Sequence, residues 1–154
     1  MSIQERLQQR KYRNLAEESF VGLLYAGGQV LRRLEEICGR HGITHTQYNV
    51  LRILRGAHPE GHPRCEIACR LISRAPDVTR LLDRLEQSGL IERSWSGENR
   101  RHSIARITGK GLGLLEAVDP EVEGLEAETT GRLSAAEQKM LARICERLAR
   151  VEES

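Results

Sequence analysis

Arginine side chains gather in the middle of the chain, at spacings that suit binding to a polyanion such as nucleic acid. Arg74, Arg80 and Arg84 lie on or just before a predicted helix over residues 76–88. The apolar residues of that helix fall at i, i+3, i+4 and i+7: Val78, Leu81, Leu82 and Leu85. One face is therefore apolar, and the opposite face carries guanidinium groups, which donate hydrogen bonds to phosphates and guanine edges. We predict that this face enters the major groove of double-stranded DNA.

A second basic group lies at a predicted hairpin tip over residues 96–101. There Arg100 and Arg101 directly follow Asn99. A short loop with paired arginines is typical of segments that reach into a minor groove. We therefore predict that the tip contacts DNA beside the helix.

Internal ion pairs offer an alternative interpretation of the helix arginines. Asp77 and Asp83 can pair with Arg80 and Arg84, which would leave a solvated surface without a ligand. For a single arginine this alternative stays open. For the whole set, in the order of elements given below, we favour groove binding.

Four candidate metal or redox ligands follow the spacing His-x3-His-x2-Cys-x3-Cys: His58, His62, Cys65 and Cys69. These residue types suit zinc, but the spacing matches no common structural zinc site, so we expect no bound metal. A thiol switch is a second interpretation, because cysteines one helical turn apart lie within Cα range of a disulfide. We favour a third, in which both cysteines are small core residues, with Cys69 against Ile72, and both histidines decorate a loop.

The other two cysteines and two further histidines carry weaker signals. Cys38 and Cys145 fall on the first and last long helices, and we expect them to pack in a dimer core. His41 and His45 flank a predicted turn, where they could form half of a metal site or, as is commoner, face solvent. All four cysteines are expected to be reduced thiols.

Motifs of common enzyme classes are missing from the sequence. It has no Gly-x-Ser-x-Gly elbow, no Gly-x4-Gly-Lys-Ser/Thr phosphate loop and no His-Glu-x2-His metal motif. We therefore predict that the protein is not an enzyme and uses no cofactor. A helical module that binds another protein is the competing class, and the paired arginines at the hairpin tip argue against it.

Length and composition limit the fold. The chain has 154 residues, of which 39% are hydrophobic, 30% charged and 3% aromatic. One domain with appended helices and an aliphatic core fits these values, whereas a disordered chain or an aromatic-stacking single-strand binder does not. No apolar run is long enough for a transmembrane helix or a secretory signal, so we expect a cytoplasmic protein. The formal net charge is only +2, but residues 64–106 hold nine arginines and six acids, and residues 115–131 hold six acids and no base.

Hydrophobic spacing and turn residues predict a mainly helical chain with a small two-stranded β-wing. The predicted helices cover residues 14–40, 48–55, 64–72, 76–88, a long stretch from 108 and a last segment after 134, and the predicted strands cover residues 90–95 and 102–107. Between residues 44 and 107 this is the order of a winged helix-turn-helix. We predict three regions: an N-terminal dimerisation helix over 1–43, the DNA-binding region over 44–107 and C-terminal dimerisation helices over 108–154.

Capping residues mark several of the helix ends. Thr44 with Gln47, and Ser134 with Glu137, form predicted capping boxes at two helix starts. Gly89 is expected to end the helix over residues 76–88 in a left-handed conformation.

The sequence also predicts a turn-rich loop over residues 56–63. Two prolines fall within predicted helices. Pro76 suits the first turn of its helix, where the missing N–H costs nothing. Pro120 should bend the long C-terminal helix or split it.

Two apolar stripes have no evident partner inside the winged module. They lie over residues 14–38 and 134–151, and left uncovered they would form a larger apolar patch than a soluble monomer tolerates. We therefore predict a homodimer. Two-fold symmetry then requires a pseudo-palindromic operator with half-sites about 10 bp apart, centre to centre.

Four segments resemble the MarR family of bacterial transcription regulators: Asp77-Val-Thr-Arg-Leu-Leu-Asp-Arg-Leu-Glu86, Gly89-Leu-Ile-Glu-Arg93, Glu98-Asn-Arg-Arg101 and Ile107-Thr-Gly-Lys-Gly111. The resemblance covers essentially the whole chain. It implies a homodimer with intertwined terminal helices that represses transcription from a palindromic operator until a small aromatic or phenolic effector releases it. It places the recognition element on Ser73, Arg74, Pro76, Asp77, Thr79, Arg80 and Arg84, and the wing contact on Arg100 and Arg101.

The chain departs from that family's pattern at two positions. Asn99 takes the place of the usual wing aspartate, so an ion pair that would hold an arginine in place is lost. Ala75 takes the place of the usual Ser or Thr before the recognition helix, which removes a side-chain cap and a phosphate donor. For an effector pocket, the sequence offers only Tyr25, Tyr48 and aliphatic walls, which do not name a molecule.

Overall fold

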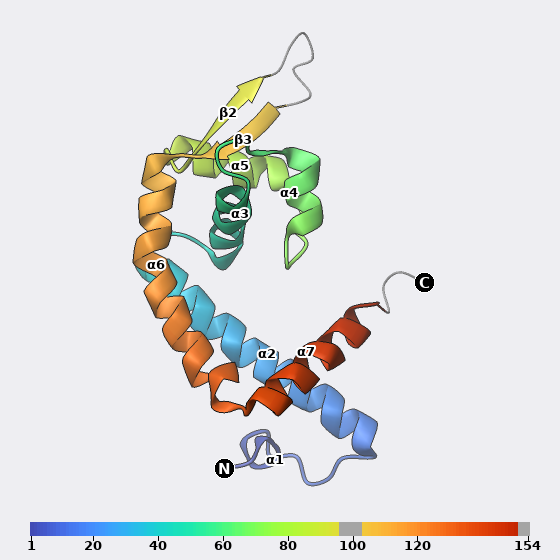
Figure 1. Ribbon diagram of the computed structural model, residues 1–154. Coiled ribbons are helices and arrows are strands. Elements are labelled where there is room, and N and C mark those ends of the chain that lie inside the picture. Colours follow the sequence, from blue (N-terminus) through green and yellow to red (C-terminus); the bar gives the residue numbers. More distant parts are fainter. Residues whose placement is uncertain (96–102, 151–154) are drawn as a thin grey trace. The chain divides into compact units, whose positions relative to one another are not determined.

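The computed structural model describes residues 1–95 and 103–150. The chain falls into two compact units, a terminal unit of residues 1–34 and 123–154 and a central unit of residues 35–122. Two long helices, α2 (Leu15–Arg40) and α6 (Gly109–Glu128), contribute to both units (Figure 1). The predicted hairpin tip with Arg100 and Arg101 lies outside the described residues. The predicted division into dimerisation and DNA-binding regions stays a prediction.

The central unit holds the elements of a winged helix-turn-helix in the predicted order. They are α3 (His45–Gly56), β1 (His62–Pro63), α4 (Arg64–Arg70), α5 (Val78–Gln87), β2 (Ile91–Trp95) and β3 (Ser103–Ile107). Helix α3 begins with the predicted capping box. The Thr44 hydroxyl accepts a hydrogen bond of 3.1 Å from the Gln47 amide, and the Gln47 side chain accepts one of 2.9 Å from the Thr44 amide. Two backbone donors at the helix start are thereby satisfied.

The strands form one antiparallel sheet in the order β1–β3–β2. Ile91 pairs with Ile107 at one end of the β2–β3 ladder, as in the predicted wing hairpin. The sequence predicted two strands, and the third, β1, comes from the segment predicted as a loop, where His62 pairs with Ala105. Gly61 has φ +78°, and a Cβ there would lie 2.2 Å from the Ala105 carbonyl oxygen. Glycine therefore lets the chain approach β3 closely enough to form the extra strand.

Aliphatic side chains form the core of the central unit. Helix α5 packs against α4 and β2, with Leu82 and Leu85 fully buried. The other side chains with almost no exposure in this unit include Val50, Leu51, Leu54, Ile67, Ile91, Ala105, Leu115 and Val118. Each fully buried leucine contributes about 1.5–3 kcal/mol, and this burial decides which face of α5 points outward.

Helix α5 begins later than the sequence pattern predicts. The prediction that Pro76 lies in the first helical turn is wrong, because Asp77 is the N-cap. Asp77 has φ −140°, and its side chain accepts a hydrogen bond of 3.0 Å from the Arg80 amide. Asp77 therefore supplies the cap that Ala75 cannot. Gly89 follows the end of the helix at φ +75°, in the predicted left-handed conformation.

Helix α6 runs through Pro120 without a break. The split that the sequence suggested at this proline does not occur. Buried side chains on both sides of the proline, at Leu115, Val118 and Val122, share one packed face. That packing outweighs the single backbone hydrogen bond that proline cannot donate.

The terminal unit contains α1 (Ile3–Arg6), the first part of α2, the last part of α6, the 3-10 turn η1 (Thr130–Arg132) and α7 (Ala135–Ala149). Helix α7 begins with the predicted capping box of Ser134 and Glu137. Large apolar side chains of this unit are exposed in the single chain: Leu15, Phe20, Leu23, Leu24, Val30, Leu31, Met140, Leu141, Ile144 and Leu148. No helix in the described part of the chain is long and apolar enough to span a bilayer.

Candidate DNA-binding surface

The outward face of α5 carries the side chains that the sequence predicts for groove binding. Thr79, Arg80 and Arg84 are exposed, while Leu82 and Leu85 are buried on the inner face. The side chain of Arg80 is 80% exposed. The apolar and cationic faces therefore separate as the spacing predicts, and the arginines are accessible to a ligand.

The segment between α4 and α5 extends this surface. Ser73, Arg74 and Pro76 are all exposed there, directly before the N-terminus of α5. Unpaired backbone amides at a helix N-terminus favour phosphate oxygens. We call the predicted recognition residues on α5 and the segment before it the α5 surface: Ser73, Arg74, Pro76, Asp77, Thr79, Arg80 and Arg84.

One of the two ion pairs offered as the alternative interpretation is present. The Nε of Arg80 lies 3.2 Å from the Asp77 carboxylate. Asp83 pairs with Arg93 instead. Within residues 1–95 and 103–150, the guanidinium of Arg84 has no hydrogen bond or ion pair. Arg80 is therefore partly neutralised, whereas Arg84 keeps its charge for an external partner.

Arg93 on β2 engages both acidic side chains of α5. Its Nε donates a hydrogen bond of 3.0 Å to Glu86, and its Nη2 donates to Asp83 and Glu86. The Arg93 side chain is only 12% exposed, and the hydrogen bond to Glu86 is the main reason why the pKa of Arg93 is raised. This network was not predicted from the sequence. The feature of the sequence that could have indicated it is an acid and a base, Glu86 and Arg93, seven residues apart on either side of the turn at Gly89.

A second polar cluster joins α3 to α6. The Tyr48 hydroxyl donates a hydrogen bond of 2.9 Å to the Asp119 carboxylate, which also pairs with Arg55. Burial, followed by this hydrogen bond, raises the pKa of Tyr48 to about 12. Because Tyr48 is only 4% exposed, it stabilises the central unit and does not form the wall of an open effector pocket.

The expectation that Cys65 and Cys69 are core residues is wrong. Both side chains are exposed, and Ile72, the expected packing partner of Cys69, is 86% exposed. The register of α4 explains this result. Its buried residue is Ile67, and a position two residues away in either direction is turned by about 200° around the helix axis. Both thiols therefore lie on the face opposite Ile67.

The described residues do not bring these cysteines into a metal site with His58 and His62. Within residues 1–95 and 103–150, no group of three or more His, Cys, Asp or Glu side chains is placed to hold a metal ion. His58 is exposed, and His62 is a half-buried residue of β1. A structural zinc ion takes four ligands, so this part of the chain offers no such site.

Carboxylates engage the two histidines at the turn between α2 and α3. The Nε2 of His41 lies 2.6 Å from Glu121, which also accepts a hydrogen bond from Arg40, and His45 pairs with Glu35. The hydrogen bond from Arg40, followed by that from His41, lowers the pKa of Glu121. Both histidines are half-buried, and both contribute to structural contacts.

The remaining two cysteines differ in environment. Cys38 is fully buried within the central unit, and burial raises the pKa of its thiol to about 11. Cys145 on α7 is exposed in the single chain. Its packing in a dimer core stays a prediction.

A basic groove of about 260 Å³ lies beside the C-terminal part of α5. Groups that can carry positive charge reach it from three places: His41 after α2, Arg84 on α5 and Lys110 on α6. The rest of its lining is Gly42, Ile43, Gln47, Ser88, Leu90 and Leu114. Positive groups beside apolar walls suit a small organic anion.

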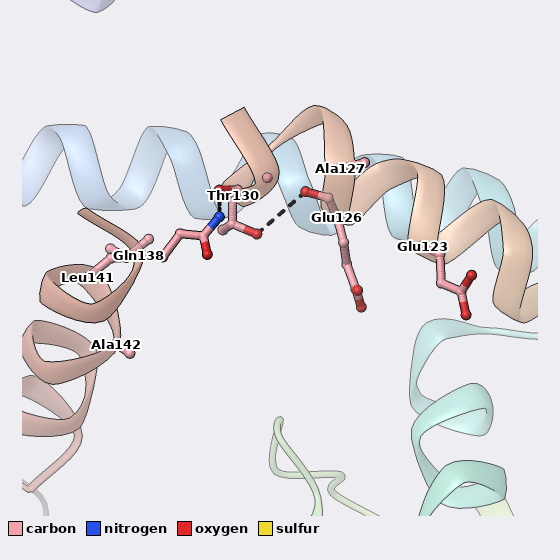
Figure 2. A pocket seen from close by; sticks show the side chains of 8 residues that line it. Glu123, Glu126, Ala127, Thr130, Gln138, Leu141 and Ala142 are labelled. Atoms are coloured by element: carbon pink, nitrogen blue, oxygen red, sulfur yellow. Dashed lines mark hydrogen bonds between the residues drawn. The ribbon is translucent and has the colours of Figure 1, made fainter. Parts of the chain in front are cut away.

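The terminal unit has a hollow of about 590 Å³ lined by α6, η1 and α7 (Figure 2). Gln138 Nε2 donates a hydrogen bond of 3.0 Å to the Thr130 carbonyl, and the Thr130 hydroxyl donates one of 3.4 Å to the Glu126 carbonyl. Among the side chains that line this hollow, Glu123 and Glu126 are acidic and none is basic. The hollow is therefore unsuited to DNA or to an organic anion.

Comparison with known proteins points to one family of sequences. The family model of the MarR family matches residues 43–103. The HTH-type transcriptional regulator MhqR of Bacillus subtilis (strain 168) is 31% identical over 109 residues, which are 71% of this chain and 74% of that protein.

Solved structures share the fold. A MarR transcription factor from Planctomyces limnophilus is 37% identical, with a TM-score of 0.69 over 88% of this chain and 98% of that chain. Sco3205 from Streptomyces coelicolor, solved in complex with DNA, is 21% identical, with a TM-score of 0.80 over 92% of this chain and 91% of that chain. At 21% identity, the likeness to Sco3205 shows the fold alone.

Proposed function

The chain belongs to the MarR family, and we propose that it regulates transcription by binding a pseudo-palindromic operator as a homodimer. In this proposal it acts in the cytoplasm as a repressor, and a small organic acid releases it from DNA. The terminal helices form the dimer, and the region over residues 44–107 binds DNA.

The charge distribution on α5 carries the proposal. Arg93 engages the acids of α5, and Arg84 has no partner among the described side chains. We infer that Arg74 and Arg84 contact phosphates, while Thr79 and Arg80 face base edges in the major groove. The N-terminus of α5 adds backbone donors for a phosphate.

A second contact with DNA is proposed from the sequence alone, at the predicted hairpin tip. Arg100 and Arg101 are the last two residues of the predicted hairpin tip over residues 96–101, and we infer that they enter the adjacent minor groove. Two grooves are then contacted by each subunit.

Exposed apolar side chains support the homodimer. Those of α2 and α7 belong to the terminal unit, and a soluble monomer rarely leaves so many of them uncovered. Sedimentation at micromolar concentration should give a dimer. A stable monomer would contradict this part of the proposal.

Selection from a random duplex DNA library tests the function directly. The purified chain should enrich a pseudo-palindrome with half-sites about 10 bp apart, and the affinity should fall steeply as the salt concentration rises. If no duplex is enriched, or if the enriched sites lack two-fold symmetry, the proposal is wrong.

The basic groove beside α5 is the effector site in this proposal. Arg84 belongs both to this groove and to the α5 surface, so a carboxylate that pairs with Arg84 competes with a DNA phosphate. Lys110 lies in the same groove, where its Nζ donates a hydrogen bond of 2.7 Å to the Ser88 carbonyl. Benzoate and hydroxybenzoates should release the operator, and benzamide, which lacks the charge, should not. In Lys110→Gln the release should need higher acid concentrations, and an unchanged response would place the effector elsewhere.

A further inference from the structure

Cys65 and Cys69 are two exposed thiols on one face of α4, and the function proposed above uses neither. We propose that they form a dithiol site for a soft atom that accepts two sulfur ligands, with trivalent organic arsenic as the chemical class. We further propose that filling the site weakens operator binding. The effect on DNA rests on the proposed function, whereas the dithiol site does not.

The spacing of the two thiols favours a bridging atom over a disulfide. Residues four apart on an α-helix have Cβ atoms about 5–6 Å apart, whereas a disulfide needs Cβ atoms about 3.5–4.5 Å apart. A disulfide would therefore unwind α4, which spans only Arg64–Arg70. One atom inserted between the two sulfurs lengthens the bridge and leaves the helix intact.

A groove of about 380 Å³ lies beside the thiols, between α4 and the start of α5. Besides both thiols, its lining includes Ala68, Ala75, Pro76, Asp77 and Thr79. Helices α4 and α5 are in contact, and Figure 1 shows them next to one another below the sheet. Ala68, Ala75 and Pro76 give the groove small apolar walls, which suit the carbon substituent of an organic arsenical.

The bonding step is an exchange of ligands without oxidation. In phenylarsine oxide, the bonds from arsenic to oxygen break and two arsenic–sulfur bonds form. The two thiol protons leave with the oxygen as one molecule of water. Arsenic stays trivalent, sulfur keeps its oxidation state, and no further reagent is consumed. The thiolate is both the nucleophile and a soft ligand in this step.

A filled site reaches the residues that begin α5. Asp77 lines the groove, and its carboxylate caps α5 at 3.0 Å and pairs with Arg80 at 3.2 Å. A phenyl group in the groove displaces Asp77 and Thr79, which removes the N-cap and shifts the α5 surface. Loss of an N-cap changes an equilibrium by about fivefold, so we expect the operator Kd to rise by at least about that factor.

The test treats the purified full chain with phenylarsine oxide and measures intact mass and operator Kd on the same samples. We expect one phenylarsenic group per chain, which withstands a monothiol and is removed by 1,2-ethanedithiol, together with the rise in Kd. Cys65→Ser and Cys69→Ser change exposed side chains, so both should fold, and each should lose the stable adduct and the effect on DNA. Cys145→Ser is the control for the adduct, because this thiol is exposed in the single chain and lies outside α4, so the variant should keep the stable phenylarsenic group.

Each contrary result overturns a defined part of the proposal. A stable adduct that survives in Cys65→Ser or Cys69→Ser, or that disappears in Cys145→Ser, overturns the dithiol site. An adduct on Cys65 and Cys69 that leaves the Kd unchanged overturns the regulatory role. If the untreated chain binds no duplex, the proposed function fails instead, and the mass measurement still decides whether the dithiol site exists.

Discussion

The Nε of Arg93 donates a hydrogen bond of 3.0 Å to the carboxylate of Glu86, seven residues earlier in the chain. The same guanidinium donates to Asp83, so one cation on β2 engages both acids of α5. Strand β2 therefore fixes the position of α5 and keeps its negative charges paired, while Arg80 and Arg84 remain exposed.

Replacing Arg93 tests this arrangement. In Arg93→Met, two uncompensated carboxylates lie on the helix that approaches DNA, so operator binding should weaken by about 1–2 kcal/mol. Fluorescence anisotropy with the selected operator measures the change. Adding Asp83→Asn and Glu86→Gln to Arg93→Met removes the uncompensated charges and should restore part of the affinity. If the triple variant binds as weakly as Arg93→Met, the charges are not the cause.

Arg84 and Arg80 should contribute to DNA binding by different routes. Arg84→Ala removes a phosphate contact, so it should weaken binding to all duplexes and reduce the salt slope by about one. Arg80→Ala should lower affinity for the selected operator by about 1–3 kcal/mol and leave binding to random duplex nearly unchanged. Arg143→Ala is the control and should change neither value, because Arg143 lies outside the α5 surface and off the apolar stripe of α7 that contains Met140 and Ile144. Parent-like binding by both test variants would refute the placement of the α5 surface.

Gly111 and Gly113 form a matched pair on α6. A Cβ on Gly111 would lie 2.3 Å from the Leu90 carbonyl oxygen and 2.7 Å from a side-chain carbon of Ile107, whereas no atom lies within 4 Å at Gly113. Gly111→Ala should therefore lower the free energy of unfolding by about 1–3 kcal/mol. Gly113→Ala should raise it by up to about 1 kcal/mol, because alanine favours the helix. Urea unfolding of both variants gives the comparison, and equal effects would contradict the close approach of α6 to Leu90.

The Tyr48–Asp119 contact predicts a stability that depends on alkaline pH. Burial and the hydrogen bond raise the pKa of Tyr48 from 10.0 to about 12 in the folded chain, so folding favours the protonated phenol. The stabilisation is complete below pH 10.0 and is lost as the pH rises through about 12. Tyr48→Phe should lower the free energy of unfolding by about 1–2 kcal/mol at neutral pH.

Urea unfolding at neutral pH and at about pH 11 measures this dependence, and the difference between parent and Tyr48→Phe should shrink at the higher pH. Tyr25→Phe is the control, since the Tyr25 hydroxyl accepts only a long bond of 3.4 Å from Arg6. It should change the free energy of unfolding by less than about 0.5 kcal/mol. A difference for Tyr48→Phe that stays constant with pH would show that the phenol does not titrate in this range.

Features that depend on near neighbours in the chain could be predicted from the sequence. The capping boxes at Thr44 and Ser134 need only a hydroxyl and an acceptor three residues later, and the left-handed turn at Gly89 needs one glycine. The exposure of the α5 surface could be predicted for the same reason. Its leucines recur at helical spacing, so the exposure of Arg80 and Arg84 follows from their place on the helix.

Features that depend on distant contacts could not be predicted in this way. Strand β1 forms because Gly61 lets the chain approach Ala105, and a loop-like composition gives no sign of it. Helix α4 is short, with isoleucine on one side and small cysteines on the other, so its pattern does not decide which side is buried. The packing of Ile67 into the core decides it, and this exposes Cys65 and Cys69.

Asp77 gives Arg80 an internal counter-ion. A phosphate that approaches Arg80 has to replace the Asp77 carboxylate, and the negative charge that remains on this carboxylate beside the phosphate offsets the gain from the new contact. An arbitrary stretch of duplex therefore gains little from Arg80. A guanine edge offers two acceptors in the geometry of the guanidinium fork and compensates for the lost pair. In the proposed function, the carboxylate thus converts a general attraction for nucleic acid into discrimination, so that Arg80, an exposed cation of the helix, distinguishes the operator from other duplex DNA.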